Sequence, residues 1–269
     1  MNLVQVLLGS VLVLTLLGAL AGLRPGLAER AAYVPAALAS LALLWGAGQT
    51  LYSGRVVSLL RVQWLPAASF NLTLDSLSAF FLLVAGLVFL AASVYGLARE
   101  EARSPASLYN LFLLSITGVL AAGNVLTFLV FWETMTVLSY LLVNTRHDRP
   151  GVARAGLVML VMSQLGTALL LAAFFLLYAY GGSFDFITLR LTAAQMPPVV
   201  RDVVFLLALG GFGVKAGTVP FQVWLPLAHP VAPANTSAVS CRAWSSTWAY
   251  TGPCGSSWVF WAGARPGGA

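Results

Sequence analysis

Long apolar runs recur along the chain, and short polar stretches separate them. A run of about 20 apolar residues crosses a hydrocarbon layer of about 30 Å as a helix. This pattern predicts an all-α polytopic membrane protein with about seven transmembrane helices in one domain. The predicted spans are Leu3–Leu23, Ala31–Leu51, Leu77–Leu97, Tyr109–Ala122, Val125–Val143, Arg154–Tyr178 and Val200–Val219.

The connections between the predicted spans are short. Only Gly123 and Asn124 separate the fourth span from the fifth, so we expect a tight turn there. The mixed segment Phe184–Pro198 is typical of an amphipathic helix on the membrane surface. The first run starts almost at Met1 without a basic segment or a cleavage motif, and we therefore interpret it as a retained helix.

The composition excludes a soluble domain. The chain has 269 residues, of which 59% are hydrophobic and 8% are charged, whereas soluble domains have roughly 25% charged residues. The net charge of +6 comes from arginines that lie singly in short loops. That placement is typical of membrane insertion, so we expect a lipid bilayer and no nucleic acid as partner.

The distribution of arginine predicts the orientation. Seven arginines lie in or beside the loops after odd-numbered spans, and four in or beside those after even-numbered spans. Because cytoplasmic loops carry the excess of positive charge, the odd loops are expected in the cytoplasm and the N-terminus outside it.

Two charged residues lie inside predicted spans. Glu133 is near the middle of the fifth span, and Lys215, the only lysine in the chain, is deep in the seventh. A charge at the bilayer centre costs roughly 2.5–3.5 kcal/mol on insertion scales. A buried lysine can exchange protons, whereas arginine stays charged. We therefore predict an ion path through Glu133 and Lys215, the alternative being a pair that only fixes helix packing.

The residues around the pair favour a path. Gly213, Gly217 and Pro220 predict a break in the seventh helix, and broken helices are tolerated where they line a cavity. Hydroxyl and amide groups are candidates for a relay; they belong to Thr136, Ser163 and Gln164. His229 is equally compatible with a ligand, a relay and a plain interfacial histidine.

The sequence has no zinc-binding spacing, no phosphate-binding glycine loop and no nucleophile triad. We therefore expect no catalytic residue, no metal and no cofactor on this chain.

Three stretches give the chain a family resemblance. It resembles the antiporter-like membrane subunits of respiratory complex I, membrane-bound hydrogenases and multisubunit sodium/proton antiporters, with the hydrogenase-4 component B branch nearest. The resemblance covers Met1 to about Val239. The matching stretches are Leu74–Phe81, Phe131–Leu141 and Gly211–Pro220, with Trp224–Pro226 and Ala228–Pro233 continuing the last.

The resemblance implies that Glu133 and Lys215 are the intramembrane pair of this family. It implies a proton-translocating subunit of a hydrogenase or complex I-type oxidoreductase in a bacterial inner membrane, with the N-terminus extracytoplasmic. Other membrane and peripheral subunits would be its partners, and redox chemistry would occur on them. Two alternatives stay open: a subunit of a cation/proton antiporter without a redox partner, and a structural scaffold. Neighbouring genes would distinguish the subunit of a redox complex from the antiporter subunit.

The chain departs from the family after Val239. Residues 240–269 are rich in Trp, Ser, Gly and Pro where the family continues with an apolar helix. Tryptophan has a single codon, UGG, and a frame starting at its third base gives glycine before Ala or Val, as at Trp248-Ala249. Read in that frame, the segment becomes apolar. We therefore predict an N-terminal half-fold over residues 1–239, an unstructured out-of-frame tail over residues 240–269, and an inactive, truncated product.

Overall fold

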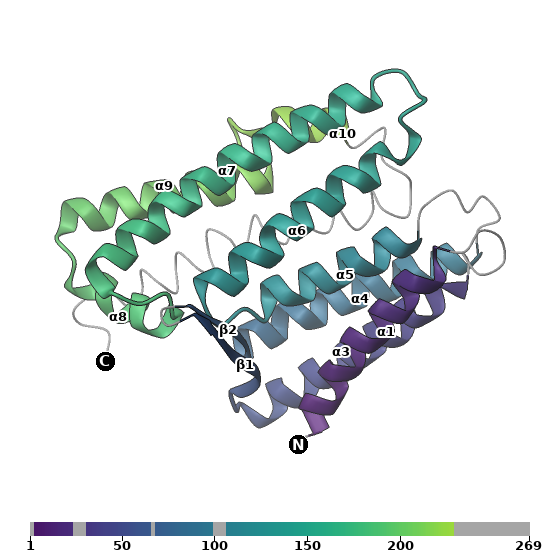
Figure 1. The fold of residues 1–269 in the computed structure, drawn as a ribbon, viewed down its shortest axis with the longest axis horizontal. Coiled ribbons are helices and arrows are strands. Elements are labelled where there is room, and N and C mark those ends of the chain that lie inside the picture. Colours follow the sequence, from purple (N-terminus) through teal and green to yellow (C-terminus); the bar gives the residue numbers. More distant parts are fainter. Residues whose placement is uncertain (1–2, 24–30, 66–67, 99–105, 229–269) are drawn as a thin grey trace.

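The computed structural model describes residues 3–23, 31–65, 68–98 and 106–228 (Figure 1). The predicted tail over residues 240–269 and the candidate relay residue His229 lie outside the described residues. Within them the chain is almost entirely helical, as the apolar runs predict. The main helices are α1 (Leu3–Ala21), α3 (Tyr33–Ser53), α4 (Ser76–Ala98), α5 (Ala106–Leu120), α6 (Val125–Val143), α7 (Val152–Gly181), α8 (Phe186–Gln195) and α9 (Pro198–Ala216).

Five of these helices are long and apolar enough to cross a membrane, namely α1, α3, α4, α6 and α7. The apolar helix α5 has only 15 residues, and α9 carries Arg201, Asp202 and Lys215 along its 19 residues. The chain is therefore a multi-pass membrane protein. The count of seven spans stays a prediction.

The helices pack as neighbours in two groups joined by α6. Helices α1, α3, α4 and α5 lie together, α6 runs between α5 and α7, and α9 packs along α7 (Figure 1). Apolar side chains from both groups and from α6 form one buried cluster, which includes Leu43, Phe89, Trp132 and Phe212. The outer faces expose large apolar side chains such as Leu16 of α1, as expected where lipid replaces water.

An unpredicted β-hairpin follows α3. Strands β1 (Val57–Leu65) and β2 (Ala68–Leu74) pair antiparallel. The hairpin binds the turn between α5 and α6, where the amide of Thr73 donates to the carbonyl of Ala121 at 2.8 Å and that of Gly123 donates to the carbonyl of Asn71 at 2.8 Å. The strands thereby fix the position at which α6 begins.

The segments after α3, α5 and α7 meet at one end of the bundle (Figure 1). Besides the hairpin contacts, the amide of Val125 at the start of α6 donates to the carbonyl of Phe184, which precedes α8, at 3.0 Å. Alternate connections on the same side are what helices of alternating direction require. The helix expected within Phe184–Pro198 is present as α8.

Polar side chains cap two of the helices at their N-termini. The Asp75 carboxylate accepts a hydrogen bond from the Ser78 amide at 2.7 Å at the start of α4. Asn124 accepts from the Thr127 amide at 2.8 Å at the start of α6, as expected of N-cap residues. Gly123 and Asn124 form the tight turn that the short spacing predicts, and this turn fixes the residue at which α6 begins.

Candidate functional site

Helix α9 ends abruptly inside the bundle. It stops at Ala216, and Gly217 follows with φ +67°, a left-handed conformation that favours glycine. The interruption predicted near Pro220 therefore begins three residues earlier. The chain then continues through a short 3-10 turn, Gln222–Trp224, into the single helical turn α10 (Leu225–Ala228).

The carbonyl groups at the broken end find new donors. The Thr218 amide donates to the Gly213 carbonyl at 3.0 Å, and the indole of Trp224 donates to the Val214 carbonyl at 2.9 Å. An added Cβ at Gly213 would lie 2.9 Å from the Thr218 hydroxyl, so the returning chain lies directly against the helix. The break is thus stabilised by hydrogen bonds to two of the carbonyl groups that lose their helical partners where α9 ends.

Lys215 lies in the last turn of α9, immediately before the break. It is buried, with 8% of its surface exposed. Its Nζ donates to the Thr136 hydroxyl at 2.6 Å and to the Ser163 hydroxyl at 3.4 Å. A cation at the C-terminal end of a helix is also favoured by the helix dipole. The last turn of α9 thus presents the Lys215 ammonium to hydroxyls of α6 and α7.

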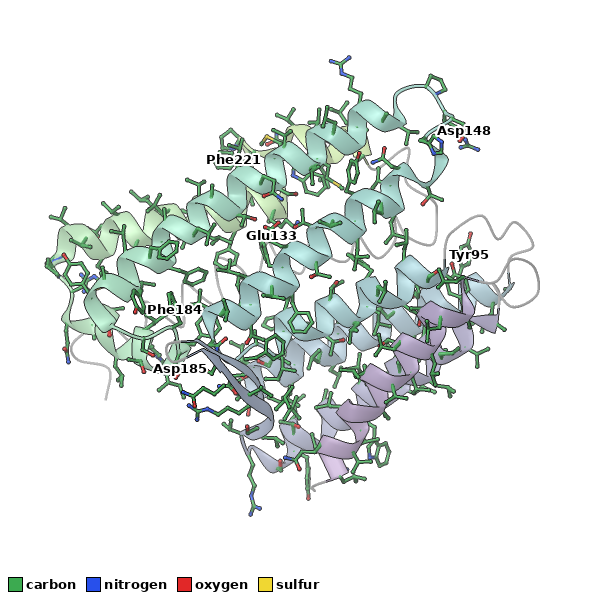
Figure 2. The ribbon with its side chains drawn as sticks, viewed as in Figure 1. Tyr95, Glu133, Asp148, Phe184, Asp185 and Phe221 are labelled. Atoms are coloured by element: carbon green, nitrogen blue, oxygen red, sulfur yellow. The ribbon has the colours of Figure 1, made fainter. Side chains whose placement is uncertain are left out.

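Glu133 lies on α6 and faces α7 (Figure 2). One carboxylate oxygen accepts from the Gln164 side-chain amide at 2.9 Å, and the other accepts from the Thr167 hydroxyl at 2.6 Å. Charge-assisted hydrogen bonds of this kind are about twice as strong as neutral ones. They hold the carboxylate against α7.

Trp132 lies between the two charged groups. Lys215 Nζ lies over its ring, 5.4 Å from the ring centroid, which is within the range of cation–π attraction. The indole N–H donates to the Thr167 hydroxyl at 3.1 Å, and that hydroxyl donates to Glu133. Trp132 and Thr167 therefore join Lys215 to Glu133.

The close crossing of α7 and α9 brings Ser163 to Lys215. A Cβ built on Gly166 would lie 2.9 Å from the Gly211 carbonyl oxygen, and one built on Gly211 would lie 2.8 Å from the Gly166 carbonyl oxygen. Gly166 follows Ser163 by three residues and Gly211 precedes Lys215 by four, about one helical turn in each case. The glycine contact therefore sets the distance between the two polar side chains.

The structure gathers most of the predicted site residues in one place. Glu133 contacts Gln164, while Lys215 contacts Thr136 and Ser163. The predicted helix-break residues Gly213, Gly217 and Pro220 lie at the end of α9 or just beyond it.

Trp132 and Thr167 were not predicted as site residues, although weak signals existed. Trp132 directly precedes Glu133, and Thr167 is three residues after Gln164 and four after Ser163, on the same helical face.

The arrangement places a buried group that can carry a positive charge near a half-buried group that can carry a negative charge, and a hydroxyl bonds each of them. Hydroxyl groups both donate and accept hydrogen bonds, so they can bind either protonation state of their neighbours. A change of charge on either group would alter the electrostatic energy of the other, since interactions are strong in a medium of low dielectric constant. The site is therefore suited to accept and release protons.

Residues 122–251 match a protein-family model described as NADH:quinone oxidoreductase/Mrp antiporter, transmembrane. The matched segment begins at the turn before α6 and contains every residue of the site described above.

Two curated proteins are similar to the chain over much of its length. An uncharacterized protein of Mycobacterium tuberculosis is 41% identical over 192 residues, which are 70% of this chain and 29% of that protein. Hydrogenase-4 component B of Escherichia coli is 38% identical over 178 residues, which are 64% of this chain and 26% of that protein. The matched part of the chain thus spans less than a third of either relative.

A solved structure shares the fold. A chain of the membrane-bound sulfane sulfur reductase, an archaeal respiratory membrane complex, superposes with a TM-score of 0.76. The sequence identity is 22%, and the match covers 92% of this chain and 53% of the other. The helix arrangement in Figure 1 is therefore one that occurs in known membrane complexes.

Proposed function

Because this chain belongs to the NADH:quinone oxidoreductase/Mrp antiporter membrane family, we propose that it carries part of a proton path in a larger membrane complex. Lys215 and Glu133 are the groups that exchange protons in this proposal. Thr136, Ser163 and Gln164 are the polar groups that bind them.

One observation carries the proposal: the chain's single lysine is buried at the broken end of α9 and faces hydroxyls on two other helices. Burying an ammonium is costly even where hydrogen bonds offset part of the cost, and charged residues inside membrane helices are therefore rare. A residue needed only for packing could be apolar at lower cost, since well-packed apolar side chains often stabilise more than a buried ionic group.

Glu133 lies on the helix that Lys215 contacts. The carboxylate of Glu133 lies on the same helix as Thr136, the closest hydrogen-bond acceptor of Lys215. A proton gained or lost by one group therefore changes the field at the other. This coupling would let a charge displacement at one side of the site drive proton movement at the other.

The similarity to hydrogenase-4 component B favours a redox-driven complex, either a hydrogenase or a complex I-type oxidoreductase. In this proposal other membrane subunits flank the chain, peripheral subunits carry the electron transfer, and the assembly lies in a bacterial inner membrane with its N-terminus outside the cytoplasm. The alternative is a cation/proton antiporter subunit without a redox partner, which the Mrp part of the family description favours.

The test uses the complex that contains this chain, purified and reconstituted into proteoliposomes. Proton movement is followed with an entrapped pH-sensitive dye after addition of either an electron donor or a sodium gradient. Movement that depends on the donor supports the redox-driven reading, and movement that depends on the sodium gradient supports the antiporter reading.

The K215A and E133Q variants are expected to lower the translocation rate by roughly tenfold or more, as is typical for loss of a proton-transfer group. K215R keeps the charge but does not release a proton, so it is expected to be as inactive as K215A. R190A is the matched control, because it removes an exposed cation on α8 away from the site. Full translocation in K215A would overturn the proposal.

A further inference from the structure

We propose that Trp132 is the positioning residue that holds Lys215 and Glu133 in a fixed relation to each other. Its ring face binds the lysine ammonium, and its indole N–H orients the Thr167 hydroxyl towards the glutamate. The purpose of this arrangement rests on the proposed proton path, but its geometry can be tested without any transport.

The indole ring is held from several sides. Trp132 is fully buried, with 0% of its surface exposed. Its ring packs against Phe128 of the same helix, with centroids 5.2 Å apart, and against Phe212 of α9, edge-on with centroids 5.8 Å apart. A side chain confined in this way has little rotamer freedom, so that whatever it contacts is placed accurately.

Lys215 is linked to Trp132 in two ways, directly through the indole ring and through Thr136 to the Trp132 backbone carbonyl. The ammonium lies 5.4 Å from the ring centroid. The Thr136 hydroxyl, which accepts from the ammonium at 2.6 Å, donates its own proton to the Trp132 carbonyl at 2.9 Å. With its proton engaged there, the hydroxyl presents a lone pair to Lys215. Trp132 thus contributes a ring face and a correctly turned acceptor to the binding of the ammonium.

The glutamate contacts Trp132 through Thr167. An indole N–H is a donor only, so the Thr167 oxygen must accept at 3.1 Å. Its single proton then goes to Glu133 at 2.6 Å or to the Ser163 carbonyl at 3.2 Å. The shorter, charge-assisted bond to the carboxylate is preferred. The indole thus occupies one lone pair of this hydroxyl, and the carboxylate takes its proton.

The indole joins the two charged groups without conducting protons between them. Its N–H keeps its proton at any pH a protein meets, and its ring face offers no lone pair. A shift of one charged group is therefore transmitted to the other through a rigid side chain, while the proton has to travel by the hydroxyl groups beside it. In this proposal the indole positions the charged groups, and the hydroxyl groups transfer the proton.

The lysine half is tested by NMR on the full chain in lipid nanodiscs. Because Lys215 is the only lysine, labelling lysine with ¹³C at Cε gives one protein signal. The Trp132 ring should displace the Hε signal upfield. W132L removes the ring and is expected to return the signal towards that of free lysine, whereas W132F keeps an aromatic face and most of the displacement.

The glutamate half is tested by infrared difference spectroscopy of the same samples, with E133Q identifying the carboxylate band of Glu133. W132F and T167V are both expected to shift this band in the same direction, because the first removes the donor that orients Thr167 and the second removes its hydroxyl. Y109F is the matched control, since it removes another buried aromatic donor, the Tyr109 hydroxyl that bonds the Phe89 carbonyl between α5 and α4, and it should leave both signals in place.

An unchanged lysine signal in W132L, or an unchanged carboxylate band in W132F, would overturn the inference. Equal changes in Y109F would do the same, because they would reveal a general loss of packing. If W132L does not fold, W132F and T167V still decide the glutamate half. W132M, which keeps a long apolar side chain without a ring, then replaces W132L in the lysine half with the same two outcomes. None of these results depends on transport, so a failed proton path and a failed positioning role are distinguishable.

Discussion

Gly166 of α7 and Gly211 of α9 touch through their backbones, and this contact places Lys215 beside Ser163. A Cβ atom on Gly166 would lie 2.9 Å from the Gly211 carbonyl oxygen, and a Cβ on Gly211 would lie 2.7 Å from the Leu170 side chain. Small residues at helix crossings in membranes allow such close approach. The close approach of α7 and α9 therefore depends on these two glycines.

We expect G211A to lower the free energy of unfolding by about 1–3 kcal/mol, since the added methyl group forces the helices apart. The same separation should weaken the contact between Lys215 and Ser163 and reduce proton translocation. Unfolding of the full chain in nanodiscs, followed by circular dichroism, measures the first effect.

The control for the glycine contact is G48A in α3, where an added Cβ would have no heavy atom within 4 Å. Alanine favours the helix at such a position, so stability should stay the same or rise by up to about 1 kcal/mol. If G211A were as stable as G48A, the crossing would not depend on close backbone contact.

The Thr136 hydroxyl is the closest acceptor of the Lys215 ammonium, at 2.6 Å. T136V keeps the shape of the side chain and removes this acceptor, which leaves a buried charged donor less well satisfied. We expect a loss of roughly 1.5–3 kcal/mol in stability together with a lower translocation rate.

T134V is the matched change on the same helix. Thr134 is exposed, and its hydroxyl donates to the Val130 carbonyl of its own helix. Its replacement should change stability by no more than about 0.5 kcal/mol. Equal effects of the two changes, in thermal unfolding and in translocation, would contradict a specific role of Thr136.

The helices were predictable because their signal is local. Each apolar run is long enough to form a helix without reference to the rest of the chain, and predicted and observed bounds differ by only a few residues. For α6 they coincide at Val125–Val143. Glu133 and Lys215 were also recognisable locally, because a charge within an apolar run is costly wherever the helix packs.

The hairpin was missed although β2 carries a signal of its own. Phe70, Leu72 and Leu74 alternate with Ser69, Asn71 and Thr73, which is the period of a strand. The segment is short, however, and besides its pairing with β1 it depends on hydrogen bonds to Ala121 and Gly123, far along the chain. A strand that depends on distant partners is weakly defined by its own sequence.

The roles of Trp132 and Thr167 could not be predicted for a related reason. A tryptophan in an apolar helix is expected in any core, and nothing local distinguishes a ring that packs from a ring that binds a cation. Its contact with Lys215 exists because α9 crosses α7 at Gly166 and Gly211, which is a tertiary property.

Asn124 anchors α6 in two ways. Its side-chain oxygen accepts from the Thr127 amide at 2.8 Å, and its side-chain amide donates to the Ser69 carbonyl of the hairpin. N124A removes both bonds and should lower stability by about 1–2 kcal/mol. N124S keeps a capping oxygen and loses the bond to the hairpin, so it should have an intermediate effect. Chemical unfolding in nanodiscs would rank the variants, and equal stability of N124S and N124A would show that the cap contributes nothing.

The last prediction concerns the break in α9. Gly217 has φ +67° and Gly54, at the end of α3, has φ +62°. Alanine in this conformation costs roughly 1–2 kcal/mol, and neither position has a neighbouring atom closer than 3.6 Å to an added Cβ. G217A and G54A should therefore destabilise the chain by similar amounts through the backbone alone.

The two changes should differ in function. Gly217 lies two residues from Lys215, and strain there is expected to extend α9 or to move its last turn, which displaces the ammonium from Thr136. Gly54 adjoins the hairpin end of α3, away from the site. We expect G217A to lose most proton translocation and G54A to retain it, measured in proteoliposomes at equal protein content. Equal translocation in the two variants at equal stability would show that the break in α9 does not serve the proton path.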